Sequence, residues 1–284
     1  TRRRLRADFR VVPPSFLRQG EWYPSQSGTN PMKTLLQLYS ARDFQPWEHV
    51  LETSAKAGYA GIEPFAAVFD DAEGFRALAD SFGLSLPSAH VPLQMLEEAP
   101  DMAFAVAKTF GMELIVVPWL PEGERPTTRA AASNLAGRLA GLCQRARQNG
   151  FDLAYHNHDF EFVPLDDGSL LLDILMEAVP DLQWESDVGW LIRAGQEPIG
   201  WLDRYADRIV AVHLKDYDGA DSEGGWTDLG HGPTDYAPIF ARLSSLPKLR
   251  YCIAEHDDPS DFSRFATRWM ESYKKLAAQA GMNA

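Results

Sequence analysis

One local pattern recurs four times along the chain: GYAGIEPF at 58–65, GLSLPSAH at 83–90, GMELIVVP at 111–118 and GFDLAYHN at 150–157. Each segment follows an amphipathic stretch, and each begins with the glycine that suits the end of a helix. A residue just past a helix adopts a left-handed conformation, which glycine reaches at least cost. The apolar run that follows indicates a buried strand. The pattern therefore predicts helices that pass directly into strands.

The same alternation continues along the chain and predicts eight strands and eight helices. The strands are expected at 34–40, 60–65, 84–90, 113–118, 151–157, 182–187, 208–214 and 249–255. The helices are expected at 46–57, 70–82, 98–110, 127–149, 169–179, 197–206, 235–246 and 261–279. Alternating strands and helices pair their strands in parallel through right-handed crossovers. Eight such units predict a single-domain α/β fold, the (β/α)8 TIM barrel.

The length of the chain fits one such barrel. Of the 284 residues, we expect 32–284 to form the barrel. Residues 1–31 are rich in arginine and proline, and we expect an irregular N-terminal extension, a tag remnant or an upstream-start artefact there. The glycine-rich connection at 216–234 is expected to be either a lid over the barrel mouth or a solvated insertion.

Charge and hydropathy exclude several classes of partner. The formal net charge is -13, which repels phosphate backbones, so no nucleic-acid partner is expected. No apolar run approaches the roughly 20 residues of a membrane span, so no membrane is expected either. The two cysteines fit no CxxC spacing, and we expect a cytoplasmic location.

Polar side chains gather where the predicted strands end, which in this fold is the rim around the active site. Of the seven histidines in the chain, five fall there: His90, His156, His158, His213 and His256. One such histidine is usually structural. Five on one rim need a shared partner, because an unpaired polar group facing the barrel interior costs free energy. A cation is the natural partner.

One side chain from each of the last four predicted strands gives a candidate metal site: His156, Asp187, His213 and Glu255. Two nitrogen and two oxygen ligands suit a divalent transition metal. We expect Mn2+, with Zn2+, Co2+, Fe2+ or Mg2+ as alternatives. Open coordination positions would take a carbonyl and its neighbouring hydroxyl and stabilise an enediolate.

Six segments in barrel order resemble the strand ends of the sugar phosphate isomerase/epimerase family, the xylose isomerase-like TIM barrels: GYAGIEPF, SAHVPL, AYHNHDFEF, QWESDVGW, VAVHLKDY and CIAEHDD. The resemblance runs from about residue 32 to the C-terminus. It is nearest to the branch of inosose dehydratases and isomerases and of enzymes that act on 3-keto-glycosides. It implies metal ligands on the last four strands, where Asp187, His213 and Glu255 match directly. Many members have glutamate at the fourth position, where this chain has His156, so the fourth ligand is His156 or Glu161.

Roles for the other rim residues follow from their place beside the expected metal. His158 is our first choice of general acid or base, because an unperturbed histidine titrates near pH ~6.5. Glu255 is expected to act as a base as well as a ligand. Lys215 is expected to hold a substrate hydroxyl or oxyanion, and Glu63 to bind a hydroxyl or act as a second base. The substrate-binding candidates are His90, Trp190, Glu161 and Trp119.

The expected function is that of a divalent-metal-dependent isomerase or epimerase. It would remove a proton next to the carbonyl of a keto-sugar, keto-glycoside or inosose through a metal-stabilised enediolate. The close alternative is a lyase or dehydratase with the same site, which eliminates water or an aglycone. An abasic-site endonuclease is disfavoured by the charge, and a non-catalytic sugar-binding subunit by the near-complete ligand set. The partner is a small carbohydrate, with a homo-oligomer or a small second subunit left open.

Overall fold

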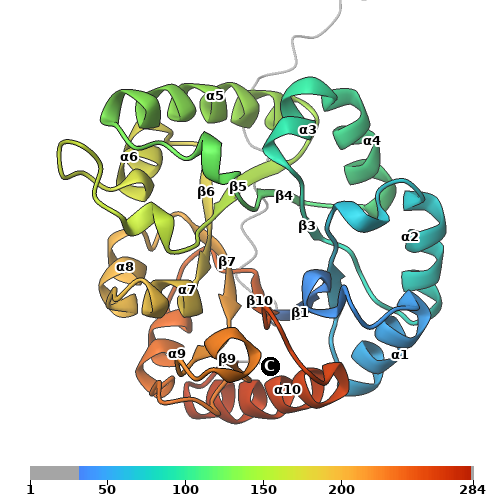
Figure 1. Ribbon diagram of the computed structural model, residues 1–284. Helices are drawn as coiled ribbons and strands as arrows, with labels where there is room; N and C mark the ends of the chain where they lie inside the picture. The colour runs from blue at the N-terminus through green and yellow to red at the C-terminus, as the bar shows by residue number, and fades with distance from the viewer. Residues whose placement is uncertain (1–31, 283–284) are drawn as a thin grey trace, which may run out of the picture. The chain divides into compact units, whose positions relative to one another are not determined.

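Eight short apolar strands lie side by side in parallel and curl into a barrel (Figure 1). The computed structural model describes residues 32–282, and the predicted extension 1–31 lies outside them. The strands are β1 (Lys33–Gln37), β2 (Gly61–Glu63), β3 (Ser88–His90), β4 (Leu114–Val117), β5 (Asp152–His156), β6 (Gln183–Asp187), β7 (Ile209–Leu214) and β10 (Tyr251–Ala254). Seven lie within the strands predicted from the sequence, β1 begins one residue before its predicted start at 34, and the (β/α)8 fold is confirmed.

The order of the strands is β2-β1-β10-β7-β6-β5-β4-β3, and a parallel bridge between Gly61 and Ser85 joins the two ends of this sheet. Glycine is required at this seam because a Cβ atom on Gly61 would collide with the carbonyl oxygen of Ser85. The seam therefore depends on a close approach of two backbones that no larger residue permits.

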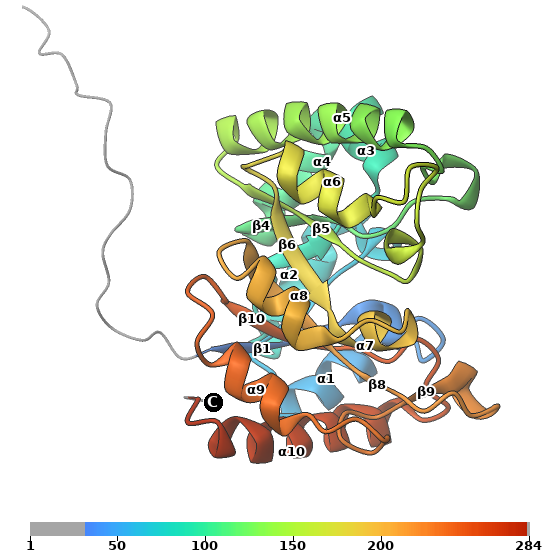
Figure 2. The ribbon, with the colours of Figure 1, turned by 90° about the vertical axis from the view of Figure 1, so that its left-hand side faces the viewer.

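Helices surround the strands, as the side view in Figure 2 shows. They are α1 (Trp47–Ala57), α2 (Ala72–Ser81), α3 (Leu93–Glu98), α4 (Pro100–Phe110), α5 (Arg129–Gln148), α6 (Leu171–Ala178), α7 (Val188–Arg193), α8 (Pro198–Arg204), α9 (Ala237–Leu243) and α10 (Phe262–Gln279). The glycines that open the four recurring segments all have positive φ, as predicted: Gly58, Gly83, Gly111 and Gly150. None of the helices in residues 32–282 is both long and apolar enough to cross a membrane.

Four short elements were not predicted: two helices and a pair of strands. α3 lies before α4, and the break between them falls where Pro100 opens the second helix. α7 begins directly after β6, with the Asp187 side chain accepting a hydrogen bond from the Trp190 amide at 2.8 Å. The 216–234 connection contains a small antiparallel pair, β8 (Asp216–Tyr217) and β9 (Trp226–Thr227). All four have at most six residues, and such short elements leave no periodic pattern in a sequence.

The barrel interior changes from apolar to polar along each strand. A small apolar cluster fills the lower barrel, with contributions from β7 and β10 that include Ala211 and Ile253. Because alternate residues of a strand face the same side, the next inward positions are His213 and Glu255. The acid and imidazole side chains therefore lie at the mouth of the barrel, above a layer of apolar side chains.

We predict that Gly61→Ala destabilises the protein by about 1–3 kcal/mol, because the added methyl group must displace the Ser85 backbone. Urea unfolding followed by circular dichroism measures this change. Gly137→Ala in α5 is the matched control: nothing lies within 4 Å of its added methyl group, and alanine in a helix should stabilise by about 0.5–1 kcal/mol. Equal stabilities of the Gly61→Ala variant and the native protein would contradict the prediction.

Candidate functional site

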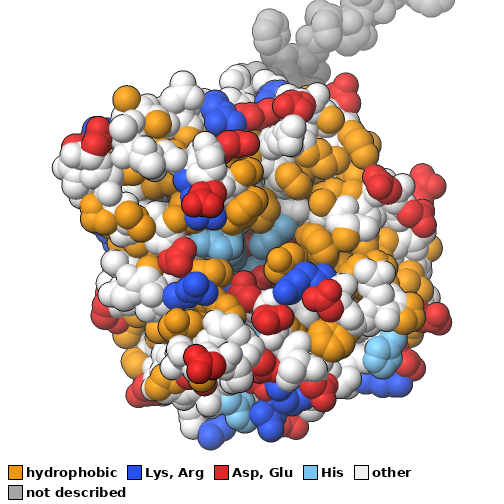
Figure 3. Space-filling model, in the orientation of Figure 1, with side chains coloured by type: hydrophobic (Ala, Val, Ile, Leu, Met, Phe, Trp, Pro, Cys, Tyr) orange, Lys and Arg blue, Asp and Glu red, His pale blue; other side chains and the backbone are white. Residues whose placement is uncertain are grey.

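The carboxyl ends of the strands surround a cavity of about 540 Å³. In Figure 3, histidine side chains are visible at the floor of a hollow in the middle of this face, with apolar side chains along its rim. The cavity is lined by Tyr39, Phe65, Ala66, His90, Pro92, Pro118, Trp119, Arg125, His156, His158, Asp159, Trp190, Glu255 and Asp257.

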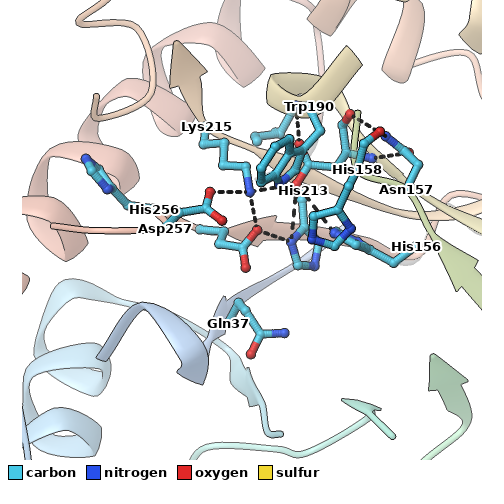
Figure 4. A network of polar contacts seen from close by, with 12 residues as sticks. Gln37, His156, Asn157, His158, Trp190, His213, Lys215, His256 and Asp257 are labelled. Atoms are coloured by element: carbon cyan, nitrogen blue, oxygen red, sulfur yellow. Dashed lines mark hydrogen bonds and ion pairs between the residues drawn. The ribbon is translucent and has the colours of Figure 1, made fainter. Parts of the chain in front are cut away.

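The four residues predicted as metal ligands come together at this floor. One ligand atom from each of His156, Asp187, His213 and Glu255 lies within 4.8 Å of the others, and all four residues are buried. The Asp187 Oδ2 atom is 3.7 Å from His156 Nε2 and 3.9 Å from His213 Nδ1. His213 Nδ1 is 2.9 Å from Glu255 Oε2. Figure 4 shows His156, His158 and His213 side by side at the strand ends, with Lys215 extending toward Asp257.

Two further carboxylates orient the imidazoles of this cluster. His156 Nδ1 lies 3.1 Å from Glu185 Oε2, and His213 Nε2 lies 2.9 Å from Glu63 Oε1 and 3.2 Å from Glu185 Oε2. A carboxylate accepts the imidazole N–H and so fixes which nitrogen keeps a free lone pair. The nitrogen left free is then His156 Nε2, which faces Asp187, whereas His213 Nδ1 lies against Glu255 Oε2.

The cluster fits a divalent cation. Asp187 Oδ2 is buried and accepts no hydrogen bond, although the Lys215 ammonium lies 3.0 Å away. A buried carboxylate oxygen without a directed partner costs free energy, and a cation placed among these atoms would satisfy it. Two imidazoles and two carboxylates are ligands that Mn2+, Zn2+, Fe2+ and Co2+ accept.

Glu185 was not assigned a role from the sequence. Its Oε2 atom also lies 2.8 Å from His90 Nε2, so three imidazoles surround one carboxylate oxygen. His90, His156, Glu185 and His213 form a second group with the spacing of metal ligands. Hydrogen bonds to the carboxylate already account for this spacing. The signal in the sequence was its position two residues before Asp187, which places it on the same face of β6.

Charges within the cluster move the pKa values of its two histidines in opposite directions. Burial acts to lower the pKa of His213, but the Glu185 and Glu255 carboxylates outweigh burial and hold that pKa well above its usual value. Burial and the neighbouring charge of His213 hold the pKa of His156 well below its usual value. His156 is therefore neutral, the form in which an imidazole binds a metal.

Lys215 lies behind the cavity instead of lining it. Its side chain is fully buried, and its Nζ atom is 3.0 Å from Asp187, 2.6 Å from Glu255 and 2.7 Å from Asp257. Burial acts to lower the pKa of Lys215, but these carboxylates raise it above its usual value. The ammonium thus neutralises acids at the floor, and a contact between Lys215 and substrate stays a prediction.

Glu63 and Glu161 also lie behind the cavity wall. Glu63 accepts hydrogen bonds from Gln37 Nε2 at 2.9 Å and from the Ser88 hydroxyl, besides its contact with His213. The Glu161 oxygens accept from the Tyr155 hydroxyl and the His158 amide, both at 2.8 Å. The sequence predicted that both glutamates contact substrate. Their oxygens hold the residues that shape the site, and Glu161 belongs to neither candidate metal cluster, so a contact of either glutamate with substrate stays a prediction.

The other predicted residues line the cavity: His90, His158, Trp119 and Trp190. His158 Nδ1 is buried and has no hydrogen-bond partner. Burial, together with the charge of Lys215, lowers the pKa of His158 to about 3, so the ring is neutral in the absence of substrate. This differs from the unperturbed value expected from the sequence, which does not reveal how deeply a side chain is buried.

Comparison with known proteins places the chain in a family. The sequence profile described as "Xylose isomerase-like TIM barrel" matches residues 51–278, and the chain belongs to this family. An inosose dehydratase from Geobacillus kaustophilus is 26% identical over 283 residues, covering 84% of this chain and 91% of that protein.

Solved structures share the fold. A sugar phosphate isomerase/epimerase from Parabacteroides distasonis superposes with a TM-score of 0.74 at 21% identity, covering 89% of this chain and 97% of that one. The IOLI protein with a binding zinc atom superposes with a TM-score of 0.69 at 14% identity, covering 89% and 99% of the two chains. The family expected from the sequence is therefore confirmed.

We predict that the purified protein binds about one divalent ion per chain and that Asp187→Asn and His213→Ala lose it, because each removes a converging ligand. Glu185→Gln should weaken metal affinity about 10- to 100-fold, since it releases the imidazoles it orients. Mass spectrometry of metal content and titration with Mn2+ measure both effects. Glu161→Gln, also a buried carboxylate, is the control and should keep the ion; unchanged content in both ligand variants would contradict the site.

We also predict a pH-dependent stability that Glu161 controls. Burial raises the pKa of Glu161 from 4.5 to about 8. The folded state then keeps a proton that the unfolded chain loses, so the free energy of unfolding falls as the pH rises between these values. Glu161→Gln should remove up to about 1.4 kcal/mol per pH unit from this slope. Urea unfolding at several pH values measures the slope.

The exposed Glu48→Gln on α1 is the control for this measurement. It should leave the dependence of stability on pH as in the native protein. A Glu161→Gln variant whose stability follows the native curve between pH 4.5 and 8 would contradict the assignment.

Proposed function

We propose that this protein is a divalent-metal-dependent lyase that eliminates water or another β-substituent from a cyclic keto-polyol, an inosose or a 3-keto sugar. The observation that carries the proposal is the buried convergence of His156, Asp187, His213 and Glu255 beside the cavity floor, with Asp187 Oδ2 left without a hydrogen bond. The relative named inosose dehydratase supports the lyase outcome over the isomerase expected first from the sequence.

A divalent cation held by these four residues would polarise a substrate carbonyl and make the neighbouring carbon more acidic. Mn2+ is the ion we propose first, because carboxylate and imidazole ligands suit it. Zn2+ is the alternative, and the zinc atom in the IOLI structure supports it. His156 takes the fourth ligand position in this proposal, since Glu161 already binds Tyr155 and the His158 amide.

Two histidines on the cavity wall divide the proton transfers between them. His158 is neutral and its Nδ1 has no partner, so it accepts a proton from the carbon next to the carbonyl. Burial opposes protonation of His90, but Glu63 and Glu185 outweigh it and raise the pKa of His90 to about 9. His90 is thus charged at neutral pH and donates a proton. Environments that separate two pKa values in this way define an acid and a base.

The elimination balances with these two groups. The C–H bond next to the carbonyl breaks, and its proton passes to His158. The C–O bond at the β-carbon breaks, and the departing oxygen takes the electron pair and a proton from His90. An unsaturated ketone and water leave, and exchange of one proton between the two histidines and solvent restores the site. Trp190 packs against His158, with ring centroids 4.8 Å apart, and keeps that imidazole in place.

An isomerase or epimerase is the second candidate function. It needs the same first step, after which the proton returns to carbon in place of a leaving group. The presence of two imidazoles, His90 and His158, on one cavity favours it, because one could deprotonate and the other reprotonate a substrate. The chemistry of the first step is common to both functions.

The proposed catalytic region, cellular location and partner are those expected from the sequence. We propose a catalytic barrel at 32–284 that works in the cytoplasm on a small carbohydrate, without nucleic acid. The net charge of -13 supports the last point. The free cysteines Cys143 and Cys252 are both buried, which suits a reducing compartment.

We predict that the Mn2+-loaded protein converts an inosose or 3-keto-glucose into a product lighter by one water, detected by mass spectrometry. His158→Gln should lower kcat by about 10²- to 10⁴-fold while leaving metal content unchanged, because it removes the base and no ligand. The exposed His49→Gln on α1 is the control and should keep native activity.

The mass of the product distinguishes the lyase from the isomerase. A product of unchanged mass that gains deuterium from heavy water would replace the lyase with the isomerase. No turnover of either ketone by metal-loaded protein would overturn the proposed function.

A further inference from the structure

The cavity is larger and more apolar than a single keto-polyol ring requires. Its volume of about 540 Å³ falls among pockets that bury drug-sized ligands, which span roughly 300–1,000 Å³. The buried acid and imidazole groups occupy the floor, and among the lining acids Asp159 is more open, with 41% of its side chain exposed. Above them the wall carries Tyr39, Phe65, Pro92, Pro118 and Trp119, which leave space beyond the reacting ring.

Two aromatic side chains at this upper wall are exposed without an evident structural need. Trp119 is 45% exposed and Tyr39 is 40% exposed; within residues 32–282 only two other large apolar side chains, Met102 and Val163, are as open. Exposed apolar groups that cluster around one cavity mark a binding surface, whereas scattered ones are ordinary. Phe65 supports Tyr39 edge-to-face, with ring centroids 5.5 Å apart.

Arg125 adds a positive charge to the same wall. Its guanidinium lies 4.2 Å from the Phe160 ring centroid and 5.5 Å from that of Trp119, and its Nε donates to the Leu120 carbonyl at 3.1 Å. No carboxylate of the described chain pairs with it. Arg125 is half-buried, so its remaining N–H groups are held at the cavity by stacking and are free to bind an acceptor.

We propose that this upper part of the cavity is a second subsite, which binds a planar apolar group attached to the polyol. The ring stacks on Trp119, and an acceptor or carboxylate on the ring binds Arg125. The subsite extends the substrate class from a bare keto-polyol to one that also carries an aryl group. The placement of the polyol at the floor rests on the proposed function, whereas the subsite rests on the wall residues alone.

The experiment uses non-oxidised ligands, so that binding is measured without turnover. Isothermal titration of the Mn2+-loaded protein compares methyl, phenyl and 4-carboxyphenyl β-D-glucosides. We expect the phenyl glucoside to bind about three- to tenfold more tightly than the methyl glucoside, and the carboxyphenyl glucoside to bind more tightly still.

Variants of the wall residues test which side chain causes each increase in affinity. Trp119→Ala should abolish the advantage of phenyl over methyl. Arg125→Met should abolish the advantage of the carboxylate while the phenyl advantage remains. Val163→Ala is the control, because it shortens an exposed apolar side chain elsewhere. It should change neither the affinity ratio of phenyl to methyl glucoside nor that of carboxyphenyl to phenyl glucoside. Thermal unfolding checks that each variant is folded.

The outcomes separate this proposal from the proposed function. Equal affinities for methyl and phenyl glucosides, binding of neither, or ratios that the Trp119→Ala variant leaves unchanged would overturn the subsite. Aryl-dependent binding by a protein that turns over neither ketone would support the subsite and overturn the lyase.

Discussion

The site depends on one interaction: the contact between the Glu185 carboxylate and three imidazoles. Its Oε2 atom lies 2.8–3.2 Å from ring nitrogens of His90, His156 and His213. Glu63 reinforces the arrangement at the same nitrogen of His213, Nε2. Each of these contacts places one ring nitrogen against Glu185 as the donor, so the opposite nitrogen of the ring points toward the cavity or the candidate metal ligands. Without them the rings would be free to turn, and their lone pairs would not converge.

The apolar layer below this network strengthens the hydrogen bonds between Glu185 and the imidazoles. Ala211 and Ile253 fill the lower barrel, and His213 and Glu255 follow them on the same strand faces. Low polarity beneath the cluster strengthens every charge interaction above it and makes unpaired groups costly. The alternation of strand residues thus determines both where the site lies and how strongly its groups perturb one another.

The same alternation explains what the sequence could predict. Asp187, His213 and Glu255 were found because strand ends and face parity follow from the pattern of apolar residues. The depth of a side chain does not follow from it: Lys215 is on the right face, yet carboxylates hold it below the cavity. Arg125 lies in an irregular loop before α5, where no period exists, so its place in the cavity wall required the structure.

Charges at the floor are paired, and this bears on what the site admits. Lys215 lies against Asp187, Glu255 and Asp257. His90 and His213 lie against Glu63 and Glu185. A floor whose charged groups already have partners does not select a charged substrate, which suits an uncharged keto-polyol. Arg125 is the exception, since no carboxylate of the described chain offsets it. Charge selectivity, where this protein has it, must therefore act at the mouth and on the part of the ligand remote from the reacting ring.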